Sequence, residues 1–233
     1  MTAEKKKKRG RVLLISAILL FAAGLSLLVF PVISDWLYER DVQRQKDAFE
    51  NMSGTDSRLE ALYQELLRQN KKLFEEKQKN LTDPFSYSQP SIDLSGYGLD
   101  DNIIGFVSIP KMDVELPILL GANEENMRKG AVHLTETSYP IGGDNTNCVL
   151  AAHRGYSRTA MFRDIELLEK GDEIFIENFR QTITYQVEET AVISPTDVDK
   201  LLIQPGKDMV TLITCHPYRH NYQRYVVYCR RSG

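Results

Sequence analysis

The chain has 233 residues, of which 26% are charged and 42% are hydrophobic, and its formal net charge is −3. Nucleic-acid binding usually requires a strongly basic domain, so this charge balance argues against a nucleic-acid partner. The length allows one domain with a sizeable core and an appendage.

The chain opens with a basic tail and a long apolar run. Residues 1–11 contain six Lys and Arg residues against one Glu, and residues 12–33 contain no charge. Those 22 uncharged residues can span a bilayer as a helix. The positive-inside rule predicts a cytoplasmic tail, a transmembrane signal anchor and an extracellular remainder. A cleaved signal peptide is the alternative, but it would have a shorter apolar core and a small-residue cleavage site. We therefore expect a single-pass protein of the cell membrane.

Two non-strand segments follow the predicted anchor. Residues 34–80 place leucines at helical spacing and form a predicted helical spacer, interrupted near Gly54. Residues 81–98 contain Pro84, Pro90 and two glycines among Ser and Asp residues. This composition predicts a loop.

Residues 99–233 have the pattern of a mainly β domain. Short apolar runs alternate with turn residues, which favours a closed β-barrel or a sandwich of seven or eight strands. We expect one short helix at Thr159–Leu168. The expected strands are Ile103–Ile109, Val114–Leu119, Cys148–Ala152, Glu173–Glu177, Thr182–Ile193, Met209–Thr214 and Tyr225–Cys229.

Three residues at strand ends could support acyl transfer through a thioester. Cys215 ends a β-branched run, which gives a nucleophile a rigid platform with one open side. His153 ends another apolar run and could protonate a leaving amine. Arg224 opens the last strand, and in an antiparallel pair it would return to the level of Cys215. Its guanidinium stays charged and could stabilise an oxyanion.

Each of these residues also has an ordinary structural interpretation. An isolated cysteine is more often inert, and single histidines or arginines are more often loop or surface residues. His133 competes with His153 for the acid role, whereas His216 and His220 lie too near Cys215 in sequence to face it readily. No zinc-ligand spacing, phosphate-binding loop or dinucleotide motif occurs, so no metal or cofactor is expected.

Taken together, the Thr211–Cys215 motif, the upstream His153 and the downstream Arg224 resemble the signature of sortases, the membrane-anchored cysteine transpeptidases of Gram-positive bacteria. The resemblance extends from Ile103 to the end of the chain. It implies an eight-stranded β-barrel at residues 99–233, with Cys215 attacking the Thr-Gly bond of an LPXTG-like sorting signal. His153 would protonate the departing amine and Arg224 would hold the oxyanion.

The loop at residues 81–98 is similar to the lid of pilus-building class C sortases. There, Asp83 would reach Arg224 and Phe85 would cover the thiol. The expected partners are proteins with sorting signals and an amine acceptor, most readily a pilin lysine. Class C members commonly have a second membrane helix after the barrel, which this sequence does not show. A class B-like or housekeeping role in anchoring proteins to cell-wall peptide therefore stays open. So do a plain cysteine hydrolase and a non-catalytic membrane-tethered assembly module.

The three cysteines cannot all pair within one chain, and a Cys148–Cys229 bridge is conceivable from the residues alone. The sortase resemblance implies that one strand separates these two residues. Two interstrand spacings, about 10 Å, are too far for a disulfide.

Overall fold

A computed structural model describes residues 3–52, 57–86, 92–99, 102–155 and 159–232. The chain divides into two compact units, Met1–Asp41 and Val42–Gly233, which are described separately. The predicted helix break at residues 53–56 lies outside the described residues.

The first unit consists of helical residues of α1 (Ala3–Met52), which continues into the second unit. Its apolar side chains are exposed; Leu20, for example, is 74% exposed. Gly10–Asn51 has a mean hydropathy of 2.8 in its most apolar stretch, and it is the one helix in the described part of the chain that is long and apolar enough to cross a membrane. This helix is a candidate membrane anchor.

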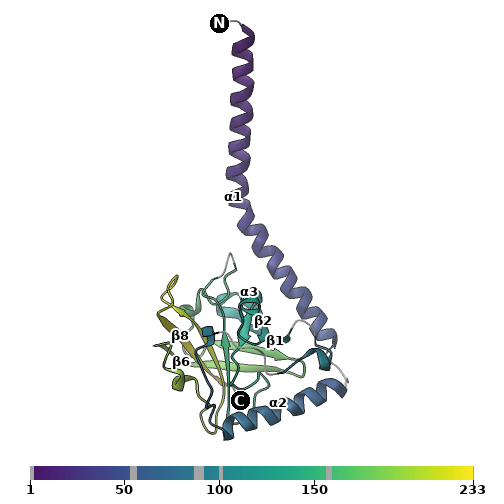
Figure 1. Ribbon diagram of the computed structural model, residues 1–233, viewed down its shortest axis with the longest axis vertical. Helices are drawn as coiled ribbons and strands as arrows, with labels where there is room; N and C mark the ends of the chain where they lie inside the picture. The colour runs from purple at the N-terminus through teal and green to yellow at the C-terminus, as the bar shows by residue number, and fades with distance from the viewer. Residues whose placement is uncertain (1–2, 53–56, 87–91, 100–101, 156–158, 233) are drawn as a thin grey trace. The chain divides into compact units, whose positions relative to one another are not determined.

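The second unit is a closed β-barrel with the strand order β1-β2-β3-β4-β7-β8-β6-β5, which confirms the predicted fold class. Figure 1 shows the long β6 and β8 side by side at the left of the barrel. The strands are β1 (Ile103–Ile109), β2 (Val114–Leu120), β3 (Ala131–His133), β4 (Thr146–Ala151), β5 (Glu173–Asn178), β6 (Thr182–Ile193), β7 (Asp208–His216) and β8 (Gln223–Arg231).

The expected helix at Thr159–Leu168 is wrong. Residues 161–164 form turns, and only the 3₁₀ helix η4 (Ile165–Leu167) is helical. The segment buries Met161, Phe162 and Ile165, so its apolar spacing reflects side chains packed into turns rather than one face of a helix. The other short helices are α3 (Glu124–Lys129), η1 (Pro84–Ser86), η2 (Ser95–Tyr97), η3 (Pro110–Met112) and η5 (Val198–Leu201).

Helical residues before the barrel pack against it. Helix α2 (Ser57–Glu75) buries Leu59, Leu62 and Leu66, as its apolar stripe predicts, and lies along the barrel in Figure 1. At the end of α1, Phe49 meets Phe106 of β1 edge to face, with ring centroids 5.5 Å apart. The spacer therefore contributes apolar surface to the fold of the second unit.

The pairing around β7 confirms the separation expected for the two remote cysteines. Cys148 on β4 is level with Val210 on β7, and Val210 is level with Cys229 on β8. A strand therefore lies between them, and all three cysteines are free thiols.

Candidate active site

Strand register brings together the three residues that the sequence singled out. Cys215 on β7 pairs directly with Arg224 on the antiparallel β8. On its other side β7 runs parallel to β4, where Ala151 pairs with Ile213. His153 follows Ala151 by two residues, as Cys215 follows Ile213. This register places the His153 backbone at the level of Cys215, so that Cys215 lies between the residues that carry an imidazole and a guanidinium.

Hydrogen bonds extend the β4–β7 alignment beyond the end of β4. The Ala152 amide donates to the Ile213 carbonyl over 3.3 Å. The Thr214 hydroxyl donates to the Ala152 carbonyl over 2.7 Å, and the Thr214 side chain is fully buried. Both backbone groups of Ala152 are therefore held on β7. The threonine before the cysteine, present in the sequence motif, thus helps to position His153.

Arg224 is almost fully buried beside the thiol, and residues of the loop that precedes the barrel hold it there. Its Nη1 lies 3.9 Å from Cys215 Sγ. Its Nε and Nη2 donate to the two carboxylate oxygens of Asp83, each over 2.8 Å. The Phe85 ring lies over the guanidinium, with its centroid 4.7 Å from Cζ. A bidentate pair of this kind is strong and directional, so Asp83 occupies donors that an oxyanion would use.

Burial and charge disfavour the ionised form of both candidate reacting groups. Burial raises the pKa of the Cys215 thiol; the charges of Arg224 and Arg154 oppose this rise, and that of Asp83 adds to it. Burial also lowers the pKa of His153, helped by the nearby charge of Arg128. Neutral thiol and neutral imidazole are therefore favoured while Asp83 contacts Arg224.

Replacing Asp83 with Ala should speed alkylation of Cys215 by iodoacetamide near neutral pH. The change removes a negative charge that raises the thiol pKa, and it releases the loop that carries Phe85. A lower thiol pKa moves the midpoint of the alkylation rate to lower pH, because the thiolate is the reacting species. Stopped alkylation followed by mass spectrometry measures the rate. Thr82→Ala, at an exposed neighbouring position, is the control. An Asp83→Ala rate equal to that of the control would identify the segment as an ordinary turn.

The remaining histidines have other surroundings. His133 is 2% exposed, and its Nε2 lies 3.1 Å from the carbonyl oxygens of both Thr137 and Ser138. Burial lowers its pKa to about 4, so it is a neutral core residue. His216 contacts Arg154 and Glu166, and His220 lies exposed in the loop after β7. Neither Arg154 nor Glu166 was identified from the sequence.

The described residues contain no group of three or more His, Cys, Asp or Glu side chains arranged to hold a metal ion. In α3, Glu124 is paired with Arg128 and Glu125 with Lys129, each four residues along the helix. These two glutamates stabilise their own helix.

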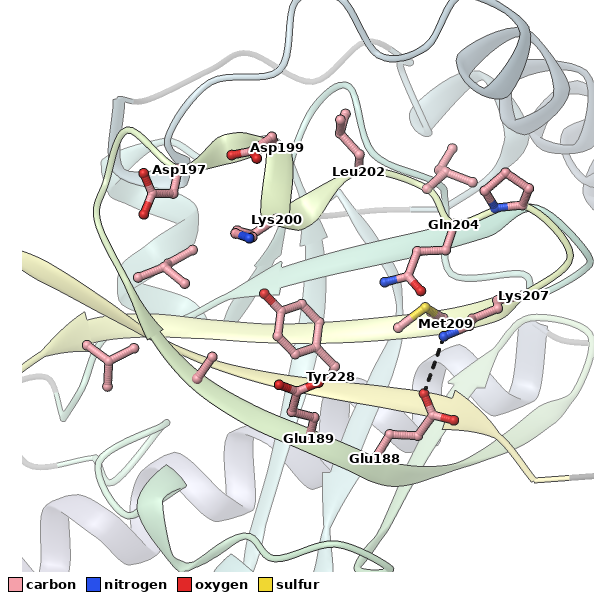
Figure 2. A pocket seen from close by; sticks show the side chains of 15 residues that line it. Glu188, Glu189, Asp197, Asp199, Lys200, Leu202, Gln204, Lys207, Met209 and Tyr228 are labelled. Carbon is pink, nitrogen blue, oxygen red and sulfur yellow. Dashed lines mark ion pairs between the residues drawn. The ribbon is translucent and has the colours of Figure 1, made fainter.

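A cavity of about 670 Å³ lies on the sheet face that carries Arg224, on the β6 side of that residue. Ile193 pairs with Arg224 across β6 and β8 and lines the near end of the cavity, whereas Tyr228 lines its floor. Figure 2 shows the β6–β7 loop, with Asp197, Asp199 and Lys200, arching over Tyr228 and Glu189. Glu188 faces Lys207 over 3.8 Å. The cavity therefore has an apolar and aromatic floor and a charged rim.

Comparison with known proteins points to one family. The Sortase domain model matches residues 107–232. Sortase A of Bacillus anthracis is 30% identical over 221 residues, which cover 94% of each chain. Sortase D of Bacillus subtilis (strain 168) is 31% identical over 130 residues, 54% of this chain and 63% of that protein.

The solved structures that resemble this fold include sortases C. Streptococcus agalactiae sortase C1 superposes with a TM-score of 0.73 at 32% identity, covering 81% of this chain and 95% of that one. Streptococcus pneumoniae sortase C gives a TM-score of 0.73 at 30% identity, with 83% and 97% covered. A lid mutant of the S. agalactiae enzyme gives 0.70 at 29% identity, with 81% and 95% covered.

Proposed function

Because this chain belongs to the sortase family of cysteine transpeptidases, we propose that it cleaves an LPXTG-like sorting signal and joins the acyl fragment to a pilin lysine. The observation that carries the pilus assignment is the contact of Asp83 and Phe85 with Arg224. It is the lid arrangement that the sequence resemblance to class C sortases leads us to expect.

The first half-reaction needs Cys215, His153 and Arg224. His153 takes the proton of the Cys215 thiol, and the thiolate attacks the carbonyl carbon of the Thr-Gly bond. Arg224 holds the resulting oxyanion once Asp83 has left it. Protonated His153 gives its proton to the departing glycine amine, the C–N bond breaks, and the thioester remains. In the second half-reaction the acceptor amine attacks the thioester, His153 takes its proton, and the thiolate leaves. Water in place of the amine gives hydrolysis.

The order of the strands suggests on which side of Cys215 each part of the substrate would lie. The leaving amine must lie near His153, on the β4 side of Cys215, so the acyl part of the substrate extends toward β8 and β6. The cavity beside Ile193 and Tyr228 lies in that direction. We therefore assign it to the residues of the sorting signal on the acyl side of the scissile bond.

The lid must open for this reaction to proceed. The side-chain hydrogen bonds described for Asp83 are with Arg224, and a bidentate carboxylate competes directly with an oxyanion for the same guanidinium. A lid of this type protects the thiol and excludes water until a substrate displaces it. The candidate anchor at residues 12–33 would hold the barrel on the extracellular face, where surface proteins emerge.

The test is a choice of acceptors. The full chain in detergent is mixed with an LPXTG peptide and equal concentrations of a lysine-bearing pilin domain and a cell-wall peptide amine, and the ligated products are quantified by mass spectrometry. The proposal predicts mainly the pilin conjugate. Predominant ligation to the cell-wall peptide would assign an anchoring role, whereas free acid alone would assign a hydrolase.

A further inference from the structure

The residues that follow His153 and Cys215 in the sequence contact each other. Arg154 Nη1 lies 2.8 Å from His216 Nδ1. A guanidinium can only donate, so Nδ1 is the acceptor. Arg154 lies three residues after the end of β4, and His216 is the last residue of β7, so this contact links the segments that follow the two reacting residues. The ends of β4 and β7 are therefore joined a second time, in addition to the bonds of Ala152.

Glu166, in η4, holds Arg154 in this position. Arg154 Nη2 lies 2.8 Å from Glu166 Oε1, and the Arg154 side chain is 6% exposed. The hydrogen bond from Arg154 lowers the pKa of Glu166, so the pair is ionic at neutral pH. Glu166 Oε1 also lies 3.2 Å from His216 Nδ1, but Arg154 already supplies the proton at that nitrogen.

Two further contacts restrict the guanidinium. Its Cζ lies 6.0 Å from the ring centroid of Tyr225 on β8, and its Nε lies 3.5 Å from the Arg163 carbonyl. Arg154 thus meets β7, β8 and the segment before η4 at once. Leaving a buried cation without its partners destabilises the folded state. These contacts therefore favour one geometry of the Arg154 side chain.

We propose that Arg154, His216 and Glu166 form a clamp that fixes the separation between the His153 imidazole and the Cys215 thiol, with Arg154 as a positioning residue for the transpeptidase reaction. The inference rests on the proposed function. Because both reacting groups lie one residue from the clamp, a shift of its partners moves the imidazole relative to the thiol. Misplacement of a reacting group by 1 Å can cost about 100-fold in rate. The charge of Arg154 also lowers the pKa of the Cys215 thiol, as that of Arg224 does, and so opposes the effect of burial.

The test compares two substitutions of His216 in the full chain. His216→Phe keeps a ring but removes the acceptor, and we expect thioester formation with an LPXTG peptide to slow about 100-fold. His216→Asn keeps an acceptor near the position of Nδ1, and we expect only a few-fold loss. His220→Phe, at an exposed histidine of the same loop, is the matched control and should equal the original protein. Thermal melting of each variant confirms folding.

A second measurement needs no sorting peptide. Arg154→Gln should move the pH midpoint of Cys215 alkylation upward, because a cation near the thiolate is lost; Arg163→Gln, at a largely exposed arginine, should leave the midpoint unchanged. Equal slowing of His216→Phe and His216→Asn, or slowing of neither, would overturn the clamp, as would an unmoved midpoint in Arg154→Gln. A protein that shows the expected midpoints but never forms the thioester would contradict the proposed function alone.

Discussion

Replacing Cys215 with Ala should abolish cleavage of an LPXTG peptide and leave the barrel folded. The thiol is the only protein group in the proposed mechanism that forms a bond to the acyl carbon, so its removal eliminates the covalent route. The side chain is only partly buried at the end of β7, and its loss leaves no large cavity. Release of the C-terminal peptide fragment, followed by chromatography, measures the activity.

The matched control is Cys148→Ala. Cys148 is a buried thiol on β4 that lies level with Val210 of β7, not with Cys215 or Arg224. We expect this substitution to lower the melting temperature, because a buried group is lost, and to retain cleavage. Cleavage that persists in Cys215→Ala would show that another nucleophile acts, and would favour a binding or assembly role for the barrel.

Replacing Arg224 with Lys should reduce the rate of thioester formation by about 100- to 1,000-fold, the usual cost of losing one oxyanion donor. Lysine keeps the charge, but its single ammonium cannot reproduce a planar guanidinium that reaches toward both the thiol and Asp83. Single-turnover acylation measured by quenched flow and mass spectrometry gives this rate.

The same change also removes the bidentate contact that holds the lid, so a second variant separates the two effects. Asp83→Ala opens the lid and leaves Arg224 intact, and the Asp83→Ala, Arg224→Lys double variant shows what Arg224 contributes in an open site. We expect the double variant to remain slow in acylation while its thiol alkylates readily. An acylation rate restored to that of Asp83→Ala would show that Arg224 acts only through the lid.

The mainly β class was predictable because its signals are local, whereas the choice of a closed barrel over a sandwich came from the resemblance to sortases. Most strands are short, β-branched runs between turn residues, and periodicity identifies such runs. The barrel also contains β3, a three-residue strand too short to give a pattern. The turn-rich segment after Thr159 misled the prediction for the opposite reason, since buried residues such as Phe162 imitate helical spacing without forming a helix.

The candidate site was predictable where a motif marks the residue and unpredictable where only the fold makes the contact. Cys215 and Arg224 are nine residues apart, so an antiparallel pair brings them level, as observed. Glu166 reaches Arg154 from a turn segment, and no periodicity marks such a residue. Arg154 follows His153 directly, and that adjacency was the one available signal. The cavity beside Tyr228 depends on how the β6–β7 loop folds back, which strand patterns do not specify.

The most direct test of the central claim is the mass of the full-length protein after incubation with an LPXTG peptide. The mechanism predicts a covalent adduct with the mass of the acyl fragment, located on Cys215 by peptide mapping and lost when a lysine-bearing acceptor is added, with the ligated product appearing in equal amount. A protein that cleaves the peptide without any adduct on Cys215, or whose adduct is not passed to the amine, would contradict the account.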